Sequence, residues 1–208
     1  MKKSTPVLFA AAVALATLFA TPAWAQAWPT RGPIKLVAVF PPGGSVDQVS
    51  RILAPSLQQQ LGQSVVVENK GGGAGGSIGA KFVAAADPDG YTILITPGGS
   101  LTTGPAVHKN IGYDPAKAFV PVAYLIESPL IMCVHPSVPA KTIAEFVAYA
   151  KANAGKVSWG SQGFGTAPHL LAEMFKLETG LNVLHVPYRG TAPMLAAVVA
   201  GEVQIVMD

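Results

Sequence analysis

Short apolar runs alternate with segments of helical periodicity from about residue 33 onward. In the first half, this pattern predicts strands at 34–40, 65–68 and 91–96 and helices at 46–61 and 78–86. In the second half, it predicts strands at 120–125, 130–135, 157–159, 183–186 and 203–207 and helices at 142–153, 168–179 and 193–200. Because apolar strands that alternate with helices are typical of parallel sheets covered on both faces, we expect an α/β fold with two lobes.

The first residues have the pattern of an export signal. Lys2 and Lys3 precede an apolar run at 7–19, and Ala23-Trp24-Ala25 is a small-x-small cleavage sequence. The alternative is an uncleaved anchor, which the short run disfavours because a membrane span needs about 20 apolar residues. The chain ends directly after a predicted strand, without a helix to cover it. We therefore expect a signal peptide at 1–25, a first lobe at 26–122 and an incomplete second lobe at 123–208.

Charge and cysteine content narrow the class of protein. The formal net charge of +3 includes Lys2 and Lys3, so the chain without its signal is nearly neutral. Lys and Arg do not cluster with aromatic residues, which argues against a nucleic-acid partner. Cys133 is the single cysteine, so it cannot form an internal disulfide, and we expect a buried thiol.

The loop at 40–47 is the first candidate site. In open α/β sheets, ligands bind beyond the carboxyl ends of the strands, where this loop lies. Gly43 and Gly44 allow backbone amides to approach a ligand closely, and the helix that follows favours an anion at its N-terminus. Ser45 either caps the helix or donates its hydroxyl to a carboxylate. Asp47 either stabilises the first turn of the helix or contacts the ligand.

The loop at 161–166 occupies the same position in the second series of elements. It contains Ser161, Gly163, Gly165 and Thr166 and also leads into a helix. Hydroxyls and amides in these two loops would hold an anion between the lobes, although Thr166 is also a preferred helix cap. Arg189 either pairs with a substrate carboxylate or faces solvent.

Two enzyme patterns are present only in part. The sequence 71–76 formally matches the dinucleotide fingerprint, but a segment with five glycines matches many patterns, and we interpret it as a tight turn. Ser161 and His169 suggest a hydrolase, but the nucleophile elbow is absent because Trp159 replaces its first glycine. The remaining histidines show no metal-binding spacing. We therefore predict no catalytic residue, no metal and no cofactor.

Several motifs resemble the substrate-binding proteins of tripartite tricarboxylate transporters, the Bug family. They are Phe-Pro-Pro-Gly-Gly-Ser-x-Asp at 40–47, Val-Val-Val-Glu-Asn-Lys at 65–70, Pro-Asp-Gly-Tyr-Thr at 88–92, Val-His-Pro-Ser-Val-Pro-Ala-Lys at 134–141, Gly-Ser-x-Gly-x-Gly-Thr at 160–166 and His-Val-Pro-Tyr-Arg-Gly at 185–190. The resemblance implies a two-lobed periplasmic-binding-protein (Venus-flytrap) fold, incomplete in this chain, because members of the family continue for about another hundred residues.

The same resemblance implies a function. It predicts a periplasmic, monomeric protein that binds a small carboxylate and delivers it to the permease subunits of a secondary transporter. Phe40 in the first loop would contact the ligand, and Asp208 matches an acidic residue at the end of the family's corresponding strand. Val39 departs from the family, which usually has Pro there. The alternatives are an exported esterase-like hydrolase and a truncated chain without function.

Overall fold

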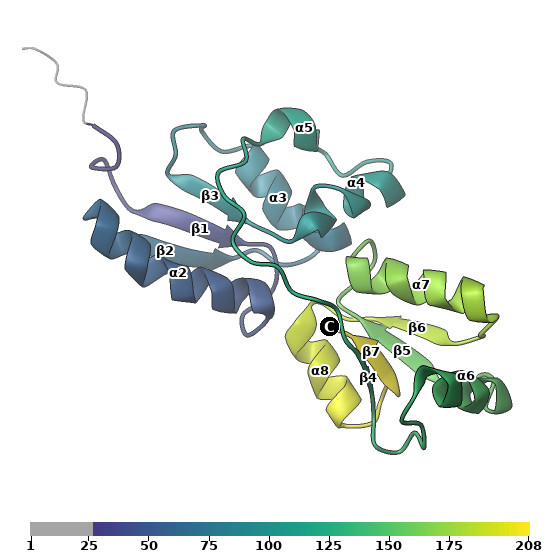
Figure 1. The fold of residues 1–208 in the computed structure, drawn as a ribbon. Helices are drawn as coiled ribbons and strands as arrows, with labels where there is room; N and C mark the ends of the chain where they lie inside the picture. The colour runs from purple at the N-terminus through teal and green to yellow at the C-terminus, as the bar shows by residue number, and fades with distance from the viewer. Residues whose placement is uncertain (1–26) are drawn as a thin grey trace, which may run out of the picture. The chain divides into compact units, whose positions relative to one another are not determined.

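The computed structural model describes residues 27–208, and residues 32–208 form one compact unit that contains two β-sheets (Figure 1). The predicted signal peptide lies outside the described residues. Among the residues described, no helix is both long and apolar enough to cross a membrane.

The first sheet is parallel and has the strand order β2-β1-β3. Its elements are β1 (Ile34–Ala38), α2 (Ser45–Leu61), β2 (Val65–Asn69), α3 (Ser77–Ala84) and β3 (Thr92–Ile95). The central strand β1 is the most deeply buried, because Ile34, Leu36 and Val37 are fully covered. A strand with neighbours on both sides and helices packed against it requires the nearly continuous apolar sequence that identified β1.

The second sheet has the strand order β4-β7-β5-β6. Its elements are β4 (Met132–Val134), α6 (Ile143–Ala152), β5 (Ser158–Ser161), α7 (Ala167–Thr179), β6 (Leu184–Pro187), α8 (Thr191–Val199) and β7 (Ile205–Met207). Trp159 at the centre of β5 is fully buried, and its ring packs against Phe175, which also contacts Phe146. The expectation of wholly parallel sheets was wrong here, because β4 pairs antiparallel with β7.

Four short helical elements were missed by the sequence analysis. They are η1 (Ala74–Gly76), η2 (Gly98–Ser100), α4 (Thr103–Val107) and α5 (Pro115–Ala118). Each is five residues or shorter, which is too short to show a helical period in its apolar positions.

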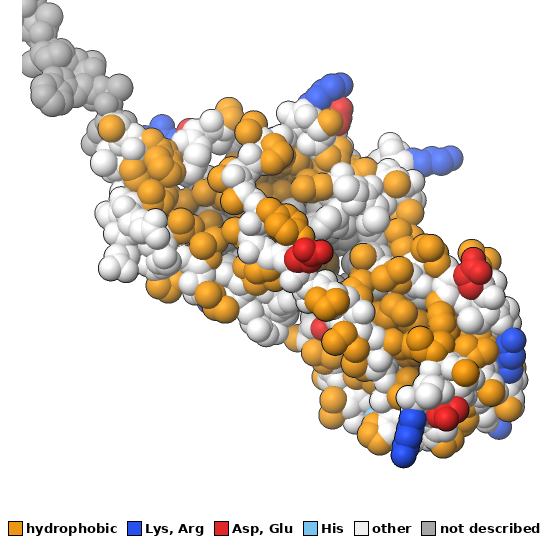
Figure 2. Space-filling model, in the orientation of Figure 1, with side chains coloured by type: hydrophobic (Ala, Val, Ile, Leu, Met, Phe, Trp, Pro, Cys, Tyr) orange, Lys and Arg blue, Asp and Glu red, His pale blue; other side chains and the backbone are white. Residues whose placement is uncertain are grey.

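The predicted strand at 120–125 does not form, and the strand predicted at 130–135 is reduced to β4. The sequence at 120–125 has high β-propensity, but a strand also needs a neighbour to accept its backbone hydrogen bonds. Here the apolar side chains are exposed, among them Val120 at 86% and Val122 at 83%. Figure 2 shows hydrophobic side chains over much of the face that this segment crosses in Figure 1. Cys133 was also expected to be buried, but it is exposed because β4 is an edge strand.

Helix α6 begins as its sequence predicts. The side chain of Thr142 accepts a hydrogen bond from the backbone amide of Glu145 at 3.2 Å, as in a capping box. The carboxylate of Glu145 in turn accepts from the amide of Lys141 at 2.6 Å. The proline at position 55 does not interrupt α2, which runs as one helix from Ser45 to Leu61.

We expect Phe146→Ala to destabilise the protein by about 3–5 kcal/mol, because it leaves a cavity beside Phe175 in the core that contains Trp159. Urea denaturation followed by circular dichroism measures the effect. Ile143→Ala on the same helix is the matched control, since Ile143 is 61% exposed, and its effect should stay within about 0.5 kcal/mol. Equal losses in the two variants would contradict the assignment of this core.

Candidate functional site

The loop between β1 and α2 is held in place by Asp47. Its carboxylate is 4% exposed and accepts hydrogen bonds from the backbone amide of Gly43 at 2.9 Å and from the side chain of Asn69 at 2.9 Å. Arg51 donates to both carboxylate oxygens at 3.0 Å. Asn69 also donates to the carbonyl of Phe40 at 3.0 Å. All of these contacts are internal to the protein, and they hold the loop in place.

These contacts change the acidity of Asp47. The hydrogen bond from Arg51 is the main cause that lowers the pKa of Asp47 to about 2, and burial opposes it. The Gly43 amide and Asn69 lower the pKa further. The carboxylate is therefore ionised throughout the neutral range, as a permanent anchor of the loop should be.

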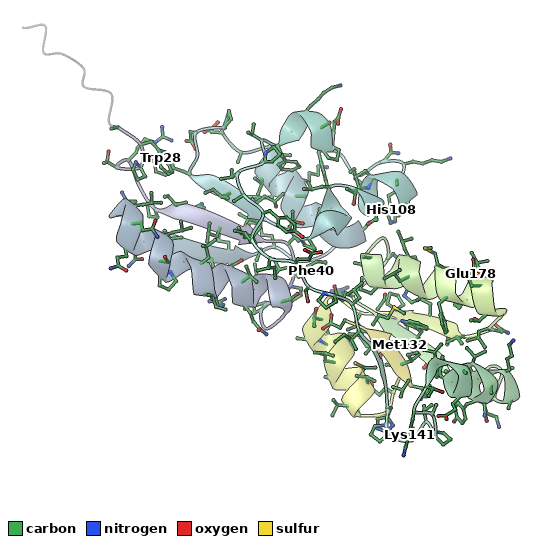
Figure 3. The ribbon with its side chains drawn as sticks, viewed as in Figure 1. Trp28, Phe40, His108, Met132, Lys141 and Glu178 are labelled. Carbon is green, nitrogen blue, oxygen red and sulfur yellow. The ribbon has the colours of Figure 1, made fainter. Side chains whose placement is uncertain are left out.

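The N-terminus of α2 is left without a side-chain cap. The N-cap residue is Gly44, and Ser45 is the first residue of the helix rather than its cap. Phe40 is 7% exposed and lies beyond the end of β1, on the side where α8 begins (Figure 3). The first backbone amides of an uncapped helix remain available to an anion, and the helix dipole favours negative charge there.

The N-terminus of α8 lies next to that of α2. A methyl group added to Gly44 would lie 3.6 Å from Cβ of Thr191, and one added to Gly43 would lie 3.7 Å from Cβ of Ala192. The N-cap of α8 is Gly190, which also has no side-chain cap and approaches Phe40 and the ring of Pro41. Two uncapped helix ends, one from each sheet, therefore converge at this point.

The absence of caps follows the chain topology. Helices α2, α3, α7 and α8 each follow a strand of a parallel pair, and none of them begins with a side-chain cap. Helices α5 and α6 begin with Asp114 and Thr142, and both caps are formed. The uncapped helix ends therefore gather at the carboxyl edges of the strands, where ligands bind in open α/β sheets.

The loop at 161–166 uses its polar groups internally. Ser161 is fully buried, and its hydroxyl lies 2.6 Å from Nε2 of His185 and accepts from the amide of Gly163 at 3.2 Å. The hydroxyl of Thr166 donates to the carbonyl of Gly163 at 2.7 Å rather than capping α7. The amide of Gly165 donates to Nδ1 of His169 at 3.3 Å. The loop is therefore preformed, and these groups are not free donors.

His169 and His185 form hydrogen bonds with residues of the 161–166 loop. The rings of His169 on α7 and His185 on β6 lie 4.5 Å apart, and the ring of Phe164 contacts both edge-on. Burial lowers the pKa of His185 to about 4, with a smaller contribution from His169, and burial also lowers the pKa of His169. Both imidazoles are therefore uncharged at neutral pH.

Ser161 therefore pairs with His185 rather than with His169, the partner that the hydrolase alternative considered. The fully buried hydroxyl cannot reach a substrate carbonyl without a rearrangement of the loop. The contact follows from the register of β5 and β6, in which Trp159 is paired with His185. Ser161 lies two residues after Trp159 and therefore projects from the same face of the sheet, diagonally opposite His185.

The glycine-rich loop at 71–76 brings three backbone segments together. A methyl group added to Gly75 would lie 2.9 Å from the carbonyl carbon of Gly99 and 3.3 Å from the carbonyl oxygen of Gly165. The amide of Gly75 donates to the carbonyl of Phe164 at 3.0 Å, and the hydroxyl of Thr103 donates to the carbonyl of Gly165. The loop thus serves close backbone approach, as its interpretation as a tight turn suggested.

Asp208 and Arg189 differ in their environment. Asp208 Oδ1 accepts hydrogen bonds from Gln162 and, at 3.5 Å, from the hydroxyl of Thr191, so Asp208 lies beside the N-terminus of α8. Arg189 is exposed. Tyr188 is partly buried and packs against the core between α8 and β7.

The sequence analysis missed the part that Thr191 and Gln162 play. Both contact Asp208 beside the two converging helix ends. The sequence does contain a pattern that points to Thr191. Pro-Tyr-Arg-Gly at 187–190 leads from a predicted strand into a predicted helix, as the loops at 40–47 and 161–166 do.

Comparisons with known proteins extend these observations. Residues 49–208 match the tripartite tricarboxylate transporter family receptor. The chain is 37% identical to Protein BugT of Bordetella pertussis over 190 residues. This match covers 89% of this chain and 58% of BugT. Its structure is similar to that of an R. palustris protein with adipate, with a TM-score of 0.82 and 37% sequence identity. This match covers 87% of this chain and 60% of the R. palustris protein.

A second solved structure is MatC from Rhodopseudomonas palustris with bound malate. Its TM-score is 0.80 at 31% identity, and the match covers 86% of this chain and 60% of that one. The chain therefore spans about 60% of the length of these relatives.

Acid should remove the stabilisation that Asp47 provides. Because the folded-state pKa lies below the ordinary value of 3.8, this stabilisation is full above about pH 4 and is lost as the pH falls toward 2. We expect Asp47→Asn to flatten the dependence of the unfolding free energy on pH in that window by about 1–2 kcal/mol. Arg51→Met should move the same transition to higher pH, because it removes the main cause of the lowered pKa. Urea denaturation between pH 2 and 6 measures both, and an unchanged pH profile in Asp47→Asn would refute the anchoring role.

Proposed function

Since the chain belongs to the tripartite tricarboxylate transporter receptor family, we propose that it captures a small carboxylate in the periplasm for a secondary transporter. The fold is the two-lobed α/β fold of periplasmic binding proteins. Similar proteins hold adipate and malate, which both carry two carboxylate groups. The observation that carries the proposal is the convergence of two uncapped helix N-termini, at Gly44 and Gly190.

These helix ends suit a carboxylate for electrostatic reasons. Each uncapped N-terminus presents unpaired amides and a partial positive charge, and the charges of α2 and α8 add at one point. Hydrogen bonds from neutral amides bind an anion less strongly than ion pairs with Lys or Arg do. A carrier that must release its ligand to a permease needs this moderate affinity.

In this proposal, the predicted site residues have several different roles. Gly43, Gly44 and Ser45 line the approach from the first loop, and Thr191 joins them from α8. Ser161, Gly163, Gly165, Thr166 and Asp47 maintain the shape of the two loops through the contacts described above. The buried ring of Phe40 supplies an apolar surface beside the first loop. Arg189 is exposed, and its positive charge attracts anions to this surface.

The proposal includes partners that follow from the family. We infer that the ligand is delivered to the permease subunits of a secondary transporter, and that the protein acts as a monomer without catalysis. The buried hydroxyl of Ser161 supports binding over hydrolysis, because a nucleophile must be accessible to its substrate.

A thermal-shift titration with adipate and with malate tests the proposal. A ligand that binds only the folded state raises the unfolding free energy by about 2.7 kcal/mol at a hundred times its dissociation constant, so the melting temperature should rise with concentration. If a panel of carboxylates that includes these two leaves the melting temperature unchanged, the proposed function is wrong.

Gly43→Ala should reduce the ligand-induced shift at least severalfold, because the added methyl group points toward Ala192 across the converging loops. Gly155→Ala is the matched control. Both glycines have a positive φ, +87° and +77°, so both variants lose basal stability, but nothing lies within 4 Å of a methyl group at Gly155. The control should keep the full ligand-induced shift. Equal loss of the shift in both variants would place the site elsewhere.

A further inference from the structure

One cluster of side chains offers metal ligands that the proposed carboxylate site does not use as ligands. His169, Glu173 and His185 each offer a ligand atom, and these atoms lie within 4.8 Å of one another. All three residues are half-buried. We propose that they form a binding site for a divalent transition-metal ion with the preferences of Zn²⁺, distinct from the helix ends at Gly44 and Gly190.

The cluster is produced by helix periodicity and strand register. His169 and Glu173 are four residues apart on α7, so they lie on one face of the helix. His185 lies on β6 and points from the sheet toward that face, since its ring is 4.5 Å from the ring of His169. The sequence does not reveal this, because His185 is distant along the chain and shows no ligand spacing to the other two.

The donor set suits the proposed ion. Two imidazoles and one carboxylate are a familiar set for Zn²⁺, in which water takes the fourth position. Tetrahedral coordination at about 2.0–2.1 Å requires donor atoms roughly 3.4 Å apart. The ligand atoms now lie within 4.8 Å of one another, so binding of the ion requires them to approach by up to about 1.4 Å.

Partners of the other ring nitrogens orient the two imidazoles. Nε2 of His185 lies 2.6 Å from the hydroxyl of Ser161, which leaves Nδ1 for the ion. A ligating histidine usually hydrogen-bonds through its second nitrogen in this way. Nδ1 of His169 accepts from the amide of Gly165 at 3.3 Å, which leaves Nε2. When Nε2 binds the ion, its proton moves to Nδ1, so this long contact is exchanged for the metal bond.

Lys176 competes with the ion. Its ammonium donates to both carboxylate oxygens of Glu173 at 2.9 and 3.0 Å. Binding of the ion must displace this ammonium from the carboxylate, and the two positive charges repel each other. The affinity of the native chain is therefore lower than that of the donor set alone, and removal of Lys176 should increase it.

The experiment uses the untagged protein after treatment with a chelator, because a polyhistidine tag would itself bind the probe. Isothermal titration with ZnCl₂, with circular dichroism to verify the fold, should show one ion per chain. Glu173→Gln and His185→Ala should each weaken binding by at least about tenfold. Lys176→Met should tighten it, which a purely structural role for the histidines does not predict.

The matched control is the double variant His108→Ala/His135→Ala, which removes the two histidines outside the cluster. It should bind Zn²⁺ like the native chain. The proposal is overturned if the native chain shows no saturable binding, or if the control loses binding as much as Glu173→Gln. Glu173 is partly exposed, so Glu173→Gln tests the site even if His185→Ala fails to fold.

Discussion

The meeting of two helix N-termini constrains the rest of the structure. Parallel strands joined by helices bring the starts of those helices to one edge of each sheet. At α2 and α8 the N-cap position holds glycine, which offers no side chain to satisfy the first amides. A side-chain cap in place of these glycines would stabilise each helix by only a few tenths of a kcal/mol, and it would occupy the donors that an anion needs. Helices α2 and α8 therefore lack this stabilisation at the ends that converge.

Because backbone amides would bind the anion in the proposed site, the polar side chains are available to shape the loops. Asp47 holds the first loop through the Gly43 amide and Asn69, and Ser161 and Thr166 hold the second through hydrogen bonds within it. Asp47, Ser161 and Thr166 are buried, and a buried polar group without a partner would be costly. The loops are therefore rigid before a ligand arrives, which reduces the entropy lost on binding.

The second loop connects several parts of the molecule. Its carbonyls accept hydrogen bonds from Gly75 and Thr103, while its interior depends on His185 and His169. An ion between those histidines would exchange the Gly165 contact for a metal bond, directly beneath the loop. The glycine-rich segment contributes by close approach of its backbone, which only residues without a side chain permit.

The sequence by itself determined the α/β class, most helices and strands, and the family. It could do so because apolar periodicity and cap residues such as Thr142 act over a few neighbouring residues. Only the tertiary structure decided that Asp47 and Ser161 are internal anchors, that Thr191 joins the first loop, and that 120–125 lacks a strand partner. It also brought His185 to the helix that carries His169. These outcomes depend on strand order and register, which join residues distant in sequence and leave no local signal in either partner.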